Sequence, residues 1–252
     1  MRPAPAQQPL HLNSGRPVRA TGSDIGDQAA GCGSAVCCPL CRTPAAEHFL
    51  AADRRDYWRC GHCELRFLDP GQLPAQREEL AHYRQHDNDP EDAGYRRFLS
   101  KLADPLLERL ASGLHGLDYG CGPGPALVLM LREAGHVMAA YDPFFRPDPE
   151  ALQRTYDFIT CTETAEHFHD PATEFDRLDA LLRPGGWLAV MTCFQDDDAA
   201  FAQWHYRRDP THVVFYREAT LRSIATLRGW TCEIPVKDVA LMRKASRGAG
   251  AT

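Results

Sequence analysis

Hydrophobic and polar residues follow one another along the second half of the chain in a pattern that predicts alternating strands and helices. Short apolar runs, the length of buried strands, are separated by stretches in which apolar residues recur every three or four positions. Such alternation is typical of a parallel sheet with right-handed helical crossovers, so we predict an α/β fold with helices on both faces of the sheet. The expected strands cover 115–119, 137–141, 157–161, 187–192, 230–235 and 237–243, and the expected helices cover 125–134, 171–182 and 217–228.

The residues before this pattern divide into three parts. Residues 1–30 are rich in Pro, Gly, Ala and Gln, and we expect them to be disordered, as is the tail over 245–252. Residues 76–112 carry an apolar face at helical spacing and predict a helical linker or cap that Pro105 breaks or kinks. A polar stretch over 82–89 interrupts it as a loop. Three residues of this cap are candidate ligand contacts, namely Tyr83, His86 and Tyr95.

Four of the ten cysteines form two CxxC pairs in residues 31–72. Cys38 and Cys41 are separated by 18 residues from Cys60 and Cys63, which is the spacing of a structural zinc site. We therefore predict a small zinc ribbon, with free thiols that hold no metal as the alternative. Cys37 could replace Cys38 as a ligand, although the two-residue spacing favours Cys38.

A glycine-rich turn follows the first predicted strand of the α/β region, which spans 113–244. It reads Asp118-Tyr119-Gly120-Cys121-Gly122-Pro123-Gly124 and lets the backbone approach a ligand closely. A nicotinamide dinucleotide would place its pyrophosphate here, but the third glycine of that motif is replaced by Pro125 and Asp118 would repel the phosphate. S-adenosylmethionine (SAM) instead presents an ammonium and a sulfonium, which suit Asp118.

The net charge of −6 argues against a protein held mainly by phosphate backbones. Only residues 1–66 have a mild basic bias, with eight Arg against six acidic residues. No apolar run approaches the roughly 18–20 residues that span a bilayer, and the first 30 residues have no apolar core of a secretory signal. We expect no membrane association and a cytoplasmic location, where a reducing environment suits metal-binding thiols.

At this point the chain resembles the class I SAM-dependent methyltransferases. The matching pieces are LDYGCGPG (117–124), the acid Asp142, YDFITCTETAEHFHDP (156–171) and LLRPGGWLAVMT (181–192). The front CPLC and CGHC motifs are similar to a ribbon found on several bacterial members. One departure is that only 14 residues separate Asp142 from Asp157, so the third strand and its helix must be short or missing.

The resemblance implies a set of cofactor-binding residues. Asp118 would take the SAM ammonium, Asp142 the ribose hydroxyls, and the backbone at Thr162 and Glu163 would border the sulfonium. Phe144 and Phe145 are candidates to cover the adenine, with Asp148 and Glu150 as alternative adenine contacts. The full cofactor set is Asp118, Gly120, Cys121, Gly122, Gly124, Asp142, Pro143, Phe144, Thr162 and Glu163.

Methyl transfer needs alignment of the acceptor with the S–CH3 bond, and a base only where the acceptor must lose a proton. The candidate catalytic residues are His167, four residues after Glu163, and His212, in an aromatic segment over 204–216 that we expect to cover the acceptor. Both have a structural alternative, as histidines bonded to neighbouring loops. The acidic body favours a small-molecule or carrier-bound acceptor. RNA or protein methylation guided by the ribbon, through Arg54, Arg55, Arg59 and Arg66, and a catalytically inactive zinc-ribbon binding protein are the alternatives.

Overall fold

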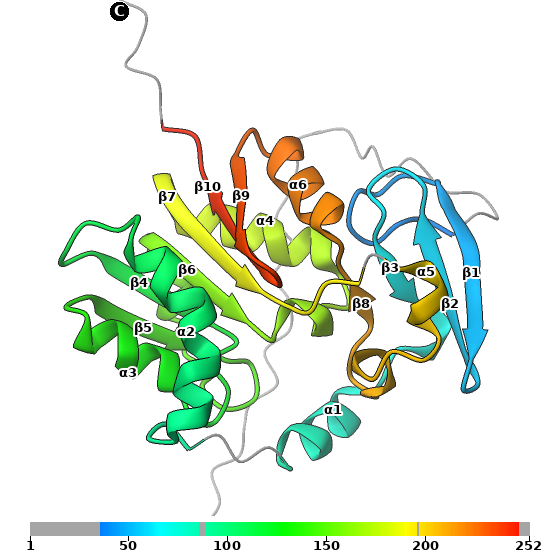
Figure 1. Cartoon of the computed structure of the whole chain (residues 1–252), viewed down its shortest axis with the longest axis horizontal. Coiled ribbons are helices and arrows are strands. Elements are labelled where there is room, and N and C mark those ends of the chain that lie inside the picture. The colour runs from blue at the N-terminus through cyan, green and yellow to red at the C-terminus, as the bar shows by residue number, and fades with distance from the viewer. Residues whose placement is uncertain (1–35, 86–88, 196, 247–252) are drawn as a thin grey trace, which may run out of the picture. The chain divides into compact units, whose positions relative to one another are not determined.

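The computed structural model describes residues 36–85, 89–195 and 197–246 (Figure 1). The segment predicted to be disordered over 1–30, most of the tail over 245–252, and the candidate contact His86 lie outside these ranges. The described residues contain no helix long and apolar enough to cross a membrane.

A six-stranded sheet forms the centre of the α/β part. Four strands run parallel, and β10 pairs antiparallel with both β7 and β9 at the end of the sheet. The predicted fold class is confirmed. The order across the sheet is β5 (Val137–Tyr141), β4 (His115–Tyr119), β6 (Tyr156–Thr162), β7 (Leu182–Met191), β10 (Val239–Arg243) and β9 (Thr231–Val236).

Helices cover both faces of this sheet because successive strand residues point to opposite sides. Phe158 and Ala189 pack in one buried cluster with helices α2 (Ala93–Leu107) and α3 (Ala126–Glu133). Their neighbours Ile159 and Leu188 pack in a second cluster with α4 (Pro171–Leu181) and α6 (Glu218–Leu227). In Figure 1, α2 and α3 accordingly lie in front of the sheet and α4 lies behind it.

Two boundary predictions were wrong. Pro105 does not break the cap helix, because it falls in the last turn of α2, which ends at Leu107. Strand β7 begins at Leu182, and not at 187 as expected, so its first residues include the Arg-Pro-Gly-Gly stretch between the expected helix and strand. Gly185 has a φ of +80°, and a Cβ on Gly186 would lie 2.7 Å from the Asp157 carbonyl oxygen. The two glycines therefore let this irregular strand start approach β6.

The predicted shortening of the third-strand region is confirmed. Between β5 and β6, the structure has only an isolated bridge that joins Asp142 to Arg146 and a short 3-10 helix over Ala151–Gln153. Strand β5 is therefore an edge of the sheet. This leaves the loop after β5 free to line a ligand site.

A second sheet contains a strand that the sequence did not reveal. Its order is β1 (Ala46–Ala52), β2 (Arg55–Cys60), β3 (Arg66–Leu68) and β8 (Val214–Phe215). The first three strands belong to the cysteine-rich region, whereas β8 comes from the aromatic segment after β7 (Figure 1). Two residues are too few to show a strand periodicity. The remaining elements are α1 (Gln76–Tyr83), α5 (Asp198–Phe201) and 3-10 helices over Pro70–Gln72, Ala165–His167 and Tyr206–Arg208.

Candidate active site

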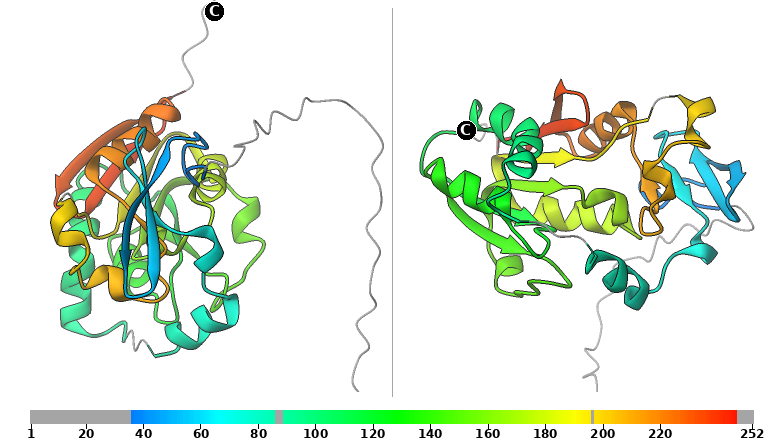
Figure 2. Two further views of the ribbon diagram at one scale, coloured as in Figure 1. Left: turned by 90° about the vertical axis from the view of Figure 1, so that its right-hand side faces the viewer. Right: turned by 60° about the horizontal axis from the view of Figure 1, so that its bottom comes forward.

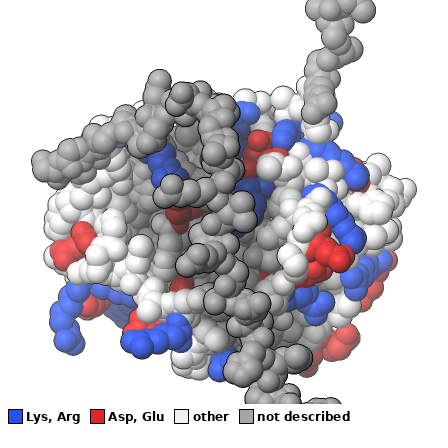
Figure 3. Space-filling model, turned by 180° about the vertical axis from the view of Figure 1, so that it is seen from behind, with Lys and Arg blue, Asp and Glu red and all other residues white. Residues whose placement is uncertain are grey.

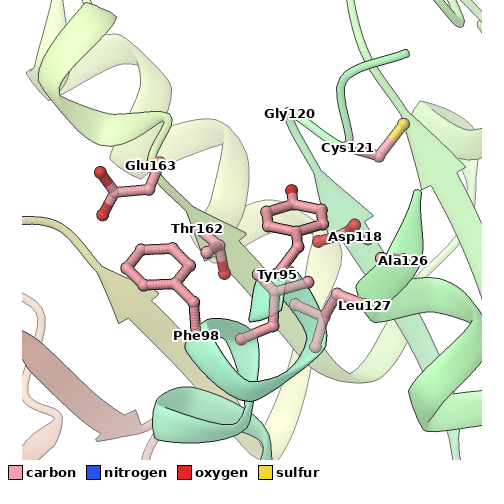
Figure 4. Close-up of a pocket in the computed structure, with 10 residues that line it drawn as sticks. Tyr95, Phe98, Asp118, Gly120, Cys121, Ala126, Leu127, Thr162 and Glu163 are labelled. Atoms are coloured by element: carbon pink, nitrogen blue, oxygen red, sulfur yellow. The ribbon is translucent and has the colours of Figure 1, made fainter. Parts of the chain in front are cut away.

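The carboxyl ends of the parallel strands open into a cavity of about 830 Å³. A much smaller cavity of about 30 Å³ adjoins it, and the two share lining residues on α2, on the glycine turn and after β6 (Figure 4). Ligands of open α/β sheets bind at this edge. The shared residues are Tyr95, Phe98, Gly120, Cys121, Thr162 and Glu163.

The glycine turn is held in a conformation that side chains would prevent. Gly120 and Gly122 have φ values of +81° and +63°, in the left-handed region that favours glycine. A Cβ on Gly120 would lie 2.2 Å from Cγ2 of Thr164, far inside contact distance. The Tyr141 carbonyl accepts hydrogen bonds from the amides of Gly120 and Cys121, at 2.8 and 3.1 Å, and so ties the turn to β5. Gly124, although predicted as a cofactor contact, lines neither cavity.

Asp118 is a buried carboxylate that has no cationic partner among the residues that the structure describes. Its side chain lines the small cavity next to Tyr95 (Figure 4), and the residue is 4% exposed. The Thr160 hydroxyl donates to its Oδ1 at 2.7 Å. Burial raises the pKa of Asp118 to about 6, with the charge of Asp142 adding to the effect. An ammonium bound here would stabilise the charge of the carboxylate, in place of the solvating water that burial has removed.

Asp142 shapes the loop after β5 as well as lining the large cavity. Its Oδ2 accepts from the Gly122 amide at 3.0 Å, and its Oδ1 accepts from the amides of Phe144 and Phe145 at 2.8 and 2.9 Å. The carboxylate therefore joins the glycine turn to the β5 loop. Pro143, Phe144 and Phe145 line the cavity beside it. Asp148 and Glu150 do not line it, and the Asp148 carboxylate accepts instead from the Glu150 amide, as a turn residue does.

Two acidic residues after β6, Glu163 and Glu166, lie close enough for their charges to interact. Glu163 has a φ of +47°, which is uncommon for a residue with a side chain and is found at strained functional positions. Burial and the nearby charge of Glu166 raise the pKa of Glu163 to about 9, so this side chain is protonated near neutral pH. Neither carboxylate oxygen of Glu166, a fully buried residue, has a hydrogen-bond partner among the described residues. Glu166 lies in the matched stretch over 156–171, which the sequence places at the ligand-binding edge of the sheet, but its burial could not be predicted because it depends on the packing of a distant segment.

The structure brings the two candidate catalytic histidines together. Their ring centroids are 4.8 Å apart. Nδ1 of His167 lies 3.0 Å from the Thr211 carbonyl oxygen, and Nδ1 of His212 lies 2.8 Å from that of Tyr206. Because a carbonyl only accepts, both Nδ1 atoms carry the proton and both Nε2 atoms keep a lone pair when the rings are neutral.

The His212 ring is neutral at physiological pH, because burial lowers its pKa. One ligand atom each from Glu166, His167 and His212 lie within 4.8 Å of one another, so these three side chains could hold a metal ion or a proton-donating group. Both histidines therefore bond to neighbouring loops through Nδ1, as the structural alternative expected. The Nε2 atom of each ring keeps a lone pair that can accept a proton or bind a metal ion.

Aromatic rings from three parts of the chain line the rest of the large cavity. The Tyr83 ring on α1 contacts those of Phe144 and His167, with centroids 5.3 and 5.2 Å apart. Tyr83 and Tyr95 both line the cavity, as expected for cap residues. Glu79, which lies 3.1 Å from His169, was not predicted as a site residue, and Asp209 was included only as part of the segment over 204–216. Their approach to the cavity depends on how α1 and the segment after β7 pack.

The four predicted cysteines converge at the base of the second sheet. Sγ of Cys38 lies 3.6 Å from that of Cys63, and Sγ of Cys41 lies 3.5 Å from that of Cys60. Four sulfurs bound to zinc at about 2.3 Å in a tetrahedron lie about 3.7–3.8 Å apart, so the cluster is close to the size that the ion requires. Cys38, and not Cys37, belongs to this group.

Comparison with known proteins gives the family. A family described as "Methyltransferase domain" matches residues 80–233, which is more than half of the chain. The chain therefore belongs to this methyltransferase-domain family, in agreement with the resemblance of its motifs to the class I SAM-dependent methyltransferases.

Two curated relatives are ubiquinone biosynthesis O-methyltransferases. The protein of Sodalis glossinidius is 27% identical over 139 residues, which cover 52% of this chain and 54% of that protein. One from Vibrio cholerae is 30% identical over 86 residues, 34% of this chain and 35% of that protein. The chain thus spans about half, or less, of the length of the curated relatives it matches.

Solved structures with a similar fold include two methyltransferases. The 1,6-didemethyltoxoflavin-N1-methyltransferase of Burkholderia thailandensis has a TM-score of 0.44 and 18% identity, over 80% of this chain and 100% of that one. The magnesium protoporphyrin IX methyltransferase of Synechocystis has a TM-score of 0.46 and 13% identity, over 67% of this chain and 94% of that one.

Proposed function

We propose that the protein transfers the sulfonium methyl group of SAM to a small-molecule acceptor. The observation that carries the proposal is the buried Asp118, which meets no cationic side chain in the described part of the chain and lies beside the left-handed glycine turn. A buried carboxylate in this position is costly unless a positive charge joins it. The ammonium of SAM supplies that charge, and no phosphate has to approach the acid.

The residues present fit the rest of the cofactor. Gly120 and Gly122 line the large cavity without side chains, so a ligand can approach their backbone, and the Asp142 carboxylate in the same lining suits a ribose diol. Pro143 and Phe144 offer an apolar surface for the adenine, and Thr162 and Glu163 border the junction of the two cavities. Bound there, SAM would supply an electrophilic methyl group directed at the large cavity.

The acceptor proposal rests on the large cavity. Its aromatic lining suits a ring, and the Nε2 lone pairs of His167 and His212 suit a hydroxyl that must lose its proton. Burial keeps His212 neutral, so it is able to accept that proton. The ubiquinone O-methyltransferases among the relatives favour a phenolic hydroxyl, free or on a carrier, and oxygen as the methylated atom.

The ribbon does not favour the RNA alternative. Three of the four arginines that supported it are turned to partners within the chain. Arg55 donates to the Asp209 and Pro210 carbonyls, Arg59 pairs with Glu47 and Asp198, and Arg66 is buried. On the face seen in Figure 3, Lys and Arg are interspersed with Asp and Glu. A phosphate backbone would need a continuous basic surface.

We also propose that the four-cysteine cluster holds one structural zinc ion. The sulfur spacing fits, and the amides of His62 and Cys63 lie 3.4 and 3.5 Å from Sγ of Cys60, as amides that support a bound thiolate do. Four reduced thiols favour a reducing compartment such as the cytoplasm.

Calorimetric titration with SAM tests the proposed function. We expect wild-type protein to bind, and Asp118→Asn, which keeps the shape and can still accept from Thr160, to weaken the affinity by about tenfold or more. Glu150→Gln is the matched control, because its exposed carboxylate lies outside both cavities and pairs with exposed Arg154. Absence of SAM binding at millimolar concentration would favour the non-catalytic binding protein.

A further inference from the structure

One segment connects the ribbon to the acceptor side of the cavity. We define the wall segment as residues 197–216, between β7 and α6. It contributes Asp209 and His212 to the cavity lining. Its other side packs on the ribbon, and the two segments lie side by side in Figure 2. Phe201, Trp204 and Phe215 of the wall share a buried cluster with Tyr57 and Leu68 of the ribbon.

Arginine side chains tie the wall segment to the ribbon at several points. Arg207 of the wall is 1% exposed and donates to the Tyr57 hydroxyl at 3.2 Å, with a further ion pair to Asp53. Arg55 of the ribbon donates to the Pro210 carbonyl at 2.6 Å. Buried Arg66 pairs with Asp198. Hydrogen bonds that involve a charged group are the stronger ones, so the wall is fixed to the ribbon along its length.

The backbone repeats this connection next to the catalytic candidates. Strand β3 of the ribbon pairs with β8 of the wall, and the Leu68 amide donates to the Val213 carbonyl at 2.8 Å. The Val213 amide then donates to the Glu166 carbonyl at 2.9 Å. Residue 213 thus links the ribbon to the loop of Glu166 and His167, and it directly follows His212.

Strand β3 depends in turn on the cysteine cluster. It has only three residues and begins three positions after Cys63. The Cys60 amide donates to the Leu65 carbonyl at 2.9 Å, which sets the start of β3 against the end of β2. A ribbon this small has too little core of its own to hold such a turn without a metal or a partner.

The cofactor half of the site, which we define as residues 118–124 and 142–145, is held in place by elements other than the ribbon. Asp118, Asp142 and the glycine turn are positioned by β4, β5 and one another, and by two hydroxyls outside the ribbon, those of Thr160 on β6 and of Thr164, which donates to the Gly120 carbonyl at 3.2 Å. Among the residues that the structure describes, no hydrogen bond joins the ribbon over 36–68 to positions 118–124 or 142–145.

We propose that the metal-loaded ribbon is the positioning element of the acceptor half of the site, and that it acts through β3 and the wall segment on His212 and on the Glu166–His167 loop. The ribbon would then fix the place of the acceptor rather than recognise a macromolecule. The inference rests on the proposed function, which assigns one half of the site to SAM and the other to the acceptor. The coupling of the ribbon to the wall segment follows from their contacts alone.

Amide hydrogen exchange of the full chain tests the proposal, with zinc bound and after removal of zinc by a chelator. We expect exchange in 206–216 and 163–168 to rise at least tenfold on zinc removal, while 118–124 and 137–145 change less than twofold and the SAM Kd stays within about threefold. Unchanged exchange in the wall segment, or an equal rise in the cofactor half, would overturn the proposal.

A variant that retains the zinc separates loss of the ribbon–wall contact from general unfolding after zinc removal. Arg55→Ala removes the bonds to the Asp209 and Pro210 carbonyls without touching a cysteine, and Arg54→Ala, an exposed neighbour, is its control. With zinc content equal, we expect faster exchange over 206–216 in Arg55→Ala alone, and partial rescue in Arg55→Lys. Equal exchange in Arg55→Ala and Arg54→Ala would contradict the proposal. Failure of the proposed function would appear separately, as no SAM binding by the zinc-loaded wild type.

Discussion

Asp118 is the residue on which the proposed SAM site depends. Because its pKa is raised into an accessible pH range, its role can be measured from the pH dependence of SAM binding. Folding raises this pKa from 3.8 to about 6 because the carboxylate is buried. SAM should bind the ionised form, so its Kd should be constant above pH 7 and rise about tenfold per pH unit below 6. Titrations between pH 8 and 5 check this dependence.

The raised pKa of Asp118 affects folding and SAM binding in opposite directions. Low pH favours the folded state at this residue, whereas high pH favours SAM binding. An acid whose folded pKa is raised contributes its stability below the unfolded pKa and loses it as the pH rises through about 6. At pH 8, Asp118→Asn should therefore raise the unfolding midpoint of the SAM-free protein while it abolishes the pH dependence of SAM binding. A lower midpoint together with an unchanged SAM Kd would contradict both statements.

Gly120 tests the turn itself. Substitution by Ala places a Cβ 2.2 Å from Thr164 at a left-handed φ, so we expect a loss of about 2–4 kcal/mol in the free energy of unfolding and loss of SAM binding. Gly113→Ala is the matched control, because its φ is also positive, at +74°, but a Cβ there meets nothing within 4 Å. Denaturant unfolding of both variants should give a clearly smaller loss for Gly113→Ala, of about 1 kcal/mol.

His212 tests the acceptor half. We expect His212→Ala to leave the SAM Kd within about twofold and to lower methyl transfer to a phenolic acceptor by about 10²–10⁴-fold, the usual range for a general base. The neighbouring exposed His205→Ala should behave as wild type. Release of demethylated SAM from a panel of phenols measures the effect, and full turnover by His212→Ala would remove this residue from the catalytic set.

At the scale of elements, the predictions succeeded where a pattern is local and long. The helix over Pro171–Leu181 could be predicted from its sequence, since Asp170 accepts from the Thr173 amide and Pro171 takes the first position. The short strand β8 and the irregular start of β7 could not, because tertiary partners create them. The burial of Glu166 could not be predicted for the same reason, because it requires the wall segment to pack against the Glu166–His167 loop.

The contact between β3 and α5 is an element-scale interaction that can be tested. Arg66 is 1% exposed on β3, and it meets Asp198 of α5 and lies over the rings of Phe49 and Phe201. Arg66→Ala should cost about 2–4 kcal/mol in the free energy of unfolding through the lost packing and ion pair. The exposed Arg54→Ala should change it by less than 0.5 kcal/mol, and denaturant titration of both variants would reveal any exception.

At the scale of the whole molecule, the sequence predicted two separate modules and the structure joins them. The cysteine spacing, the glycine turn and the strand–helix alternation each specify a module by local residues. Their connection depends on the pairing of β3 (66–68) with β8 (214–215). No local sequence pattern predicts this pairing. The ribbon and the α/β part also share one buried cluster, in which Cys60 and Phe67 pack together with Phe175 and Tyr216.

A crystal structure of the protein with S-adenosylhomocysteine would show whether Asp118 holds the ammonium of the cofactor. We expect this ammonium within hydrogen-bond distance of Asp118, the ribose beside Asp142 and the sulfur at the junction of the two cavities near Thr162. A ligand bound elsewhere, or Asp118 left without a cation while the ligand occupies the large cavity, would contradict it.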